Sequence, residues 1–119
     1  MAAVQLVRFG QNPPPAETSV PGNIVSGSPS TRLQNYFTDR TGQFFSGVWE
    51  STPGKWRVSY SESEFCAILE GRAILTGADG KAEEFKAGDA FVIPSGFEGT
   101  WETVEPLRKW YAIFEAKKA

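Results

Sequence analysis

Glycine and proline divide residues 64–101 into short apolar segments, and this division limits the fold more than any other feature of the chain. Each segment is only a few residues long, ends at a turn, and lacks the 3.6-residue apolar period of a helix. Such segments are typical of antiparallel strands. With the segments on either side, we expect about nine or ten strands and little or no helix. The clearest candidates are 43–50, 55–60, 64–70, 72–76, 82–85, 90–93, 99–104 and 107–114.

These strands and their tight connections predict an all-β fold, an antiparallel two-sheet jelly roll. The 119 residues fit one domain with one core. We expect residues 33–119 to form the barrel and residues 1–32 to form an irregular arm, because the arm is rich in Pro, Ser and Gly. Val4–Phe9 has two interpretations, a flexible leader or an extended arm that adds apolar residues to a neighbouring subunit.

The composition excludes several classes of function. Histidine is absent, so imidazole metal sites and Ser-His-Asp or Cys-His constellations cannot form within one chain. The single cysteine, Cys66, excludes an intrachain disulfide and a cysteine-cluster zinc site. We therefore expect no metal and no cofactor. With 12 basic and 14 acidic residues, nothing favours nucleic acid or a membrane surface as a partner. The N-terminus does not resemble a secretory signal, which favours a cytoplasmic location.

Two half-motifs resemble those of the cupins. Glu64 and Gly71, with six residues between them, match the end of the first cupin signature, and GDAFVIPSG at 88–96 matches the second. More narrowly, the chain resembles the small single-domain cupins grouped with ureidoglycine aminohydrolase and the ethanolamine-utilisation cupins. The phrases that carry this likeness are GVWESTPGKWRV at 47–58, EFCAILEG at 64–71, GDAFVIPSGFEGTWE at 88–102 and KWYAIFE at 109–115. The resemblance implies an antiparallel double-stranded β-helix, usually a homodimer, with a cavity for a small molecule.

The departures from the cupin pattern fall on the metal ligands. Depending on the spacing, the two histidines of the first motif would lie at Val58 and Tyr60 or at Arg57 and Ser59. The histidine and asparagine of the second motif would lie at Gly99 and Thr103, and of all the ligands only Glu64 is present. One carboxylate is a poor site for Zn, Mn or Fe. We therefore do not expect this chain to share the metal site of the cupins that it resembles.

Three residues are candidates for catalysis. Strand alternation places Glu64 and Cys66 on the same face, and the resemblance implies that this face points inward. Burial raises the pKa of a carboxylate, which suits it for acid–base chemistry. Tyr60 takes a histidine position under one of the two spacings. Lys109 shares an apolar face of the last strand with Tyr111, so it should seek a carboxylate, and Glu64 is the natural partner. The pair could transfer protons or serve only as a structural salt bridge.

Five further residues are candidates for ligand binding. Trp49, Trp101 and Tyr111 could line the cavity or simply fill the barrel, and Gly99, two residues before Trp101, is expected to leave room there. Arg57 could bind an anion under the other spacing, or lie in solvent. Cys66 is expected to be an ordinary buried thiol, because no histidine lowers its pKa.

Three functions of different classes remain open from the sequence. The first is a small-molecule-binding cupin without a metal. The second is a metal-independent lyase, isomerase or aminohydrolase-like enzyme that uses Glu64 with Tyr60 or Lys109. The third is a structural dimeric scaffold in a metabolic complex. A filled barrel would favour the scaffold, apolar walls alone would favour binding, and convergence of the three candidate side chains would favour an enzyme.

Overall fold

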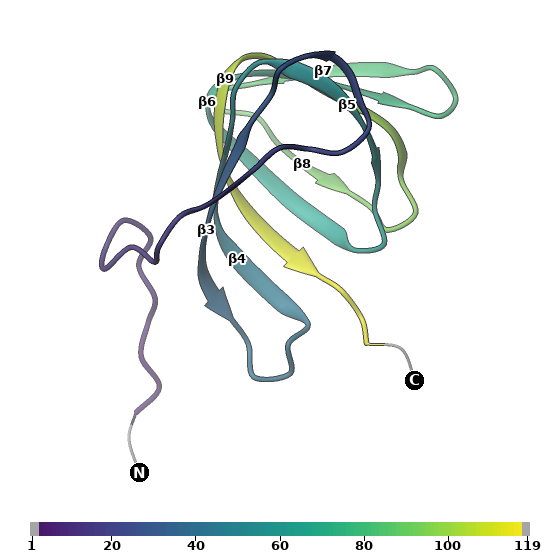
Figure 1. Ribbon diagram of the computed structural model, residues 1–119. Helices are drawn as coiled ribbons and strands as arrows, with labels where there is room; N and C mark the ends of the chain where they lie inside the picture. The colour runs from purple at the N-terminus through teal and green to yellow at the C-terminus, as the bar shows by residue number, and fades with distance from the viewer. Residues whose placement is uncertain (1–2, 118–119) are drawn as a thin grey trace.

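Nine antiparallel strands and no helix make up residues 3–117, the part of the chain that this computed structural model describes (Figure 1). Because this range holds no helix, it holds none that could cross a membrane. The strands are β1 (Glu17–Ser19), β2 (Ile24–Gly27), β3 (Thr31–Thr38), β4 (Phe44–Ser51), β5 (Gly54–Ser59), β6 (Ser63–Gly77), β7 (Ala82–Lys86), β8 (Ala90–Ile93) and β9 (Glu98–Phe114).

The two long strands β6 and β9 hold the fold together. They pair with each other from Ser63 opposite Phe114 to Gly77 opposite Gly99. The first half of β6 also pairs with β8, and the second half of β9 with β4. At the other end, β7 adds to β6 and β5 adds to β9. The sheet therefore curls into two layers that share β6 and β9 (Figure 1). This is the predicted jelly roll.

Each long strand was expected as two shorter ones, and the structure corrects this. The β6–β9 ladder continues past Gly71, although its register shifts between Ile68 and Ala73. Gly71 has a φ of +86°, and a Cβ there would collide with the main-chain carbonyl of Pro106 on β9. Glycine thus lets the strand bend and pass close to its neighbour without ending.

The core lies between the two layers. Alternate residues of β5, β6, β8 and β9 point inward, as expected for a sheet with one buried face. Two of these side chains, Trp56 and Trp101, also line the cavity described below. The buried apolar cluster comprises Trp56, Cys66, Ile68, Ala73, Leu75, Ile93, Trp101 and Leu107.

Part of the N-terminal segment joins the barrel. β1 pairs with β3, and β2 pairs with β5, so both short strands extend existing sheet edges. Val4–Phe9 pairs with no strand of the described chain, and the described residues before Phe9 extend away from the barrel (Figure 1). Phe9 is the exception in that segment, since its ring lies 5.0 Å from the Tyr36 ring and 6.3 Å from the Trp110 ring.

Candidate functional site

A buried ion pair lies between the two layers. Lys109 Nζ on β9 donates a hydrogen bond of 2.7 Å to Glu64 Oε2 on β6, and the two side chains are 4% and 8% exposed. The two residues reach each other because β6 and β9 are neighbours and both positions point inward. Either charge alone would lose several kcal/mol of solvation inside the barrel, so each makes burial of the other tolerable. This is the contact that strand alternation predicted.

Two tryptophans enclose the ammonium group of this pair. Lys109 Nζ lies 4.6 Å from the centroid of the Trp49 ring and 4.5 Å from that of Trp101. Trp49 faces Lys109 directly in the β4–β9 ladder, and the two indoles meet edge to face at 5.3 Å. The aromatic faces attract the cation and add to the pull of Glu64. The ammonium group is therefore fixed in position.

The pair determines the protonation of its neighbours. Burial, the largest single effect, would lower the pKa of Lys109, but the attractions to Glu64, Cys66 and Tyr60 together outweigh it and raise the pKa, so the side chain stays cationic. Cys66 Sγ lies 3.3 Å from Glu64 Oε2 and 3.4 Å from Lys109 Nζ. Burial raises the pKa of the Cys66 thiol to about 12, and Glu64 adds to that effect while Lys109 opposes it. Cys66 is thus a protonated thiol at neutral pH, as expected.

The ion pair forms part of the wall of a cavity of about 350 Å³. The strands β3, β4, β5, β6 and β9 supply most of its walls. Aromatic and apolar side chains predominate, and the polar groups come mainly from the ion pair and two tyrosines. The lining residues are Pro21, Thr31, Leu33, Trp49, Trp56, Tyr60, Glu64, Trp101, Lys109, Tyr111 and Ile113.

The two tyrosines of the cavity differ in what holds them. Tyr111 donates a hydrogen bond of 2.7 Å to Asn35 Oδ1, and burial, with a smaller effect of Glu64, raises its pKa to about 12. Tyr60 is fixed through its main chain, which bonds to Phe97 and Gly96, and burial raises the pKa of its hydroxyl as well. Both tyrosines are neutral at physiological pH.

Two polar atoms of residues that line the cavity have no hydrogen-bond partner in the described chain. Among residues 3–117, nothing donates to Glu64 Oε1, and the Tyr60 hydroxyl has no hydrogen bond, yet neither atom is sealed from solvent. Glu64 Oε2, in contrast, already accepts from Lys109 and Cys66. One carboxylate oxygen and one phenol are therefore available to a ligand.

A chain of hydroxyls fixes the wall behind the ammonium group. Trp101 Nε1 donates to Thr103 Oγ1 over 2.9 Å, and Thr103 Oγ1 donates to Ser51 Oγ over 2.9 Å. Ser51 in turn donates to the main-chain oxygen of Thr52. All polar atoms of the buried chain are thereby paired, and the indole of Trp101 is held in one orientation. Sequence reasoning noticed Thr103 only as a missing asparagine.

The structure brings most of the candidate residues together but not Arg57. Val58 and Tyr60, the two positions given by the three-residue spacing, both face the barrel interior: Val58 packs against the core and Tyr60 lines the cavity. Arg57 lies on the opposite face of β5, is exposed, and does not line the cavity. Since alternate residues of a strand face opposite ways, one strand cannot direct Arg57 and Tyr60 inward by the same alternation.

Gly99 does not leave the space that was expected beside Trp101. A Cβ at this position would collide with the carbonyl oxygen of Thr76 and lie 3.0 Å from the α-carbon of Gly77. The three residues lie where β5, β9 and β6 pass side by side. Glycine here permits close packing of strands, so it contributes no volume to the cavity.

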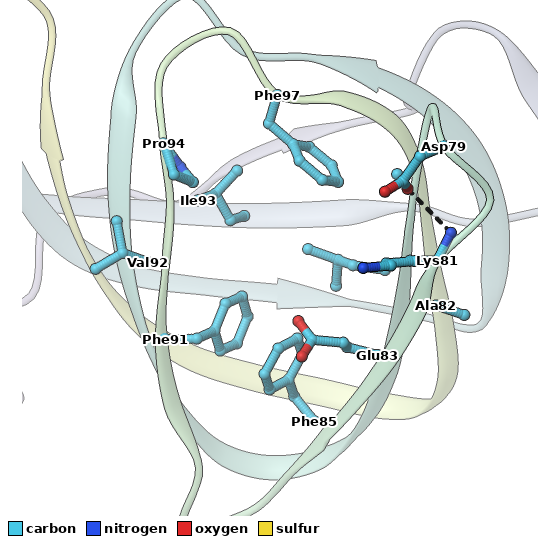
Figure 2. A pocket seen from close by; sticks show the side chains of 12 residues that line it. Asp79, Lys81, Ala82, Glu83, Phe85, Phe91, Val92, Ile93, Pro94 and Phe97 are labelled. Atoms are coloured by element: carbon cyan, nitrogen blue, oxygen red, sulfur yellow. Dashed lines mark hydrogen bonds between the residues drawn. The ribbon is translucent and has the colours of Figure 1, made fainter.

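A second, larger hollow lies away from the ion pair. It has a volume of about 630 Å³ and lies between β7 and β8, which each pair only with β6. Figure 2 shows Phe85, Phe91, Ile93 and Phe97 pointing into it, with Glu83 reaching in from β7. The rings of Phe85 and Phe91 stack at 3.7 Å. The charged side chains that line this larger hollow are exposed to solvent, whereas those of the smaller cavity are buried. The smaller cavity is therefore the better candidate for a functional site.

Several residues of the site were not found from the sequence. Trp56 shares its face with Val58 and Tyr60, and that alternation is the signal that could have placed it in the cavity. Leu33 and Asn35 lie on β3, whose pattern is weak because much of this strand is only half buried. Their position became visible only once β3 was paired with β4.

Comparison with known families agrees with this geometry. The sequence model described as the EutQ-like cupin domain matches residues 38–111. The chain belongs to the EutQ-like cupin family. The predicted resemblance is thus confirmed at the level of the family, and no match was found among curated proteins.

Solved structures place this cupin among relatives of similar fold. A protein of unknown function of the DUF861 family from Pseudomonas syringae pv. tomato is 26% identical, with a TM-score of 0.74 over 92% of this chain and 45% of the other. Clostridium difficile EutQ is 18% identical, with a TM-score of 0.67 over 76% and 66%. A DUF861 family protein from Thermotoga maritima is 36% identical, with a TM-score of 0.53 over 54% and 73%. This cupin therefore spans less than half of the Pseudomonas chain, and the likeness to EutQ concerns the fold.

Proposed function

We propose that the smaller cavity binds a small, planar, uncharged molecule that carries an N–H donor, such as an amide or a ureide. The observation that carries this proposal is the open oxygen Glu64 Oε1 beside the neutralised Glu64–Lys109 pair. The ligand donates to Glu64 Oε1 and bonds to the Tyr60 hydroxyl, while the indoles of Trp49 and Trp56 contact its faces.

Charge decides between a neutral ligand and an ionic one. Glu64 and Lys109 cancel each other, so the cavity has no net charge to offer. A cationic or anionic ligand would be desolvated among aromatic rings without a full countercharge, which is costly. A neutral N–H group satisfies the carboxylate oxygen without that cost. The volume of about 350 Å³, at the small end for ligand pockets, also favours a small molecule.

The donor set around Glu64 does not fit a divalent metal ion. The carboxylate oxygen that would bind the ion is already held by the Lys109 ammonium group at 2.7 Å. Cys66, a neighbouring sulfur 3.3 Å from Glu64 Oε2, is a thiol whose pKa is raised to about 12 by burial, and thiolate is the form that binds metals. Within residues 3–117, no three His, Cys, Asp or Glu side chains gather in a metal-binding arrangement. We therefore derive no step through a metal.

Three ligands of nearly equal shape test the proposal: benzamide, benzoate and benzylamine. Binding is measured by isothermal titration calorimetry at pH 7. We expect benzamide to bind at least about tenfold more tightly than the two ions, because a tenfold ratio needs only about 1.4 kcal/mol of the desolvation difference. Equal or tighter binding of either ion would contradict the charge argument.

Two variants locate the binding site. Tyr60→Phe removes one hydroxyl and leaves the ion pair intact, so we expect benzamide to bind several-fold more weakly to a protein of unchanged fold. Glu83→Gln is the matched control, since Glu83 lines only the larger hollow. If Glu83→Gln weakens binding and Tyr60→Phe does not, the larger hollow is the site and our assignment is wrong.

A metal-independent enzyme is the second candidate, favoured by the convergence of Glu64, Tyr60 and Lys109 on one cavity. Lys109 stays protonated and Tyr60 stays neutral because the pKa of each is raised. Among the described residues that line the cavity, Glu64 is then the only base, with Lys109 available to stabilise negative charge and Tyr60 to donate a proton. Mass spectrometry of incubated amides and ureides would show conversion that is lost in Glu64→Gln. If the amides and ureides bind without being converted, the result would support the binding function and contradict this second candidate.

A further inference from the structure

The larger hollow has an aromatic floor that is continuous with the core. Phe85, Phe91 and Phe97 line the hollow and pack against the buried cluster, yet each remains only partly covered. Figure 2 shows the three rings pointing into the hollow. The stack of Phe85 on Phe91 holds the rings of β7 and β8 together at 3.7 Å. The floor thus presents an apolar, aromatic surface to a molecule that enters the hollow.

Two opposite charges lie on the β7 side of this floor. Glu83 stands opposite Leu75 in the β6–β7 ladder, and Leu75 is buried, so both residues lie on the inner side of the layer. Lys81 precedes Glu83 by two residues and lies on the same side of the chain. Both side chains reach into the hollow (Figure 2). An inward position is normally apolar in a sheet whose other face is in water, so two charged residues in succession depart from that pattern.

Neither of these charges is paired with another residue of the described chain. Within residues 3–117, no ion pair includes Lys81 or Glu83, although the two are only roughly 7 Å apart along the chain. The next residue, Glu84, lies on the opposite face and bonds to Arg72 at 2.7 Å. The hollow therefore offers one cationic and one anionic group to a ligand.

Asp79, the third charged residue of the hollow, has a structural role. Its Oδ1 accepts a hydrogen bond of 3.0 Å from the main-chain N–H of Lys81, in the turn between β6 and β7. Gly77 completes the turn by donating its N–H to the main-chain oxygen of Lys81 over 2.9 Å. Such a contact from an aspartate side chain to the main chain is typical of tight turns. Asp79 thus fixes the turn that places Lys81 at the hollow.

We infer that the larger hollow is a second ligand site, which binds a free amino acid with a large apolar side chain. The carboxylate of the ligand bonds to Lys81, its ammonium group bonds to Glu83, and its side chain lies on the aromatic floor. A zwitterion satisfies both charges at once, whereas a cation would meet Lys81 and an anion would meet Glu83. The volume of about 630 Å³ lies within the range of ligand pockets. This inference does not depend on the ligand of the smaller cavity.

The two charges and the aromatic floor contribute differently to this site. Lys81 and Glu83 are exposed, and ion pairs in contact with solvent are weak, so each should improve binding only about threefold to fivefold. Transfer of an apolar side chain from water to the aromatic floor contributes the larger share. The charges therefore select the ionic form of the ligand, and the rings select its side chain.

Four probes test the inference: L-phenylalanine, phenethylamine, phenylpropionate and glycine. The second lacks the carboxylate of phenylalanine, the third lacks the ammonium group, and the fourth lacks the ring. Titration of the isotope-labelled full chain at pH 7, followed by NMR, gives both the dissociation constant and the place of binding. We expect L-phenylalanine to shift the amide signals of residues 81–93 and to bind at least about threefold more tightly than each of the others. Equal or tighter binding of any other probe, or shifts confined to other residues, would overturn the inference.

Variants of exposed residues identify the two contacts without disturbing the core. Glu83→Gln and Lys81→Gln should each weaken the binding of L-phenylalanine about threefold to fivefold. Glu84→Gln is the matched control, because it removes the same charge from the next residue on the opposite face, so binding should not change. An equal loss in Glu83→Gln and Glu84→Gln would reduce the effect to net charge and contradict the inference.

Tyr60→Phe separates this site from the smaller cavity. The substitution keeps the ring that lies 6.3 Å from the Phe97 ring and removes only the hydroxyl, so L-phenylalanine should bind as it does to the wild type. Benzamide, in contrast, should bind more weakly to this variant. The proposal for each cavity therefore stands or fails by its own measurement, and weaker binding of L-phenylalanine to Tyr60→Phe would place the amino acid in the smaller cavity and overturn the inference.

Discussion

Thr103 holds Trp101 in place from two positions away on the same strand, through a hydrogen bond of 2.9 Å inside the barrel. The same hydroxyl also donates to Ser51 on β4, so one side chain ties the β9 indole to the opposite strand. Trp101 is 1% exposed and forms one wall around the Lys109 ammonium group. The position of the cation thus depends on a residue that does not touch it.

This arrangement predicts a specific cost for Thr103→Val. Valine keeps the volume of threonine but leaves Trp101 Nε1 without its partner and removes one of the two hydrogen bonds of Ser51 Oγ, so the free energy of unfolding should fall by about 1–3 kcal/mol. Urea unfolding followed by tryptophan fluorescence measures this. Thr103→Ser keeps the hydroxyl and should lose less, and a Val variant as stable as the Ser variant would show that the bonds contribute nothing.

The Glu64–Lys109 pair should respond non-additively to mutation. Glu64→Gln leaves a buried ammonium group without its countercharge and should lower the free energy of unfolding by about 3–5 kcal/mol. The double variant Glu64→Gln/Lys109→Met removes both charges and should regain most of that loss. Chemical denaturation of the complete double-mutant cycle gives the coupling energy.

An exposed ion pair provides the comparison. Arg32 bonds to Glu50 at 2.8 Å, but their side chains are 48% and 37% exposed. Glu50→Gln should therefore change the free energy of unfolding by less than about 1 kcal/mol. Similar losses for Glu50→Gln and Glu64→Gln would contradict the role that we assign to burial.

Stability should fall at alkaline pH. Cys66, Tyr60, Tyr111 and Lys109 all have a raised pKa in the folded protein, with values of about 12 for Cys66 and Tyr111. In the unfolded chain these groups lose their protons first, from about pH 8.5 for cysteine and about pH 10 for tyrosine and lysine. Their contribution is thus complete below about pH 8.5 and is lost as the pH rises toward 12.

Urea unfolding at several pH values from 7 to 11 tests this dependence. The free energy of unfolding should begin to decrease near pH 8.5, where Cys66 is the first of the four to titrate in the unfolded chain. Cys66→Ala should delay the decrease until about pH 10. Stability that rises between pH 8.5 and 11 would contradict the direction of these shifts.

The reactivity of Cys66 is a simple check on the site. It is the only cysteine, is fully buried, and its pKa is raised to about 12. Because the thiolate is the reactive form, we expect Ellman's reagent at pH 8 to label the native protein at least about 100-fold more slowly than the protein in 8 M urea. Fast labelling of native protein would mean that the cavity opens to the thiol.

The sequence predicted those parts of the site that strand alternation determines. Glu64 and Lys109 were expected to form an ion pair because each lies on a strand face that was predicted to point inward. Two opposite charges inside a small barrel have few other possible partners. The jelly roll followed from the turn residues. Both inferences needed only local patterns and the rule that buried charges pair.

The sequence could not predict features that depend on how close two strands pass. Gly99 was expected to leave space, yet it lies against the main chain of Thr76 and Gly77. Gly71 was expected to end a strand, yet it lets β6 bend past Pro106. A glycine in a sequence can mark a turn, a bend or a close contact, and only the paired neighbours distinguish among them.

Because the cation of this barrel is the end of a lysine side chain, the folded molecule always contains it. Its occupancy cannot vary with supply in the cell, it cannot be exchanged for a different ion, and no chelator can withdraw it. The same covalent link limits the ammonium group to a single positive charge and to hydrogen bonding.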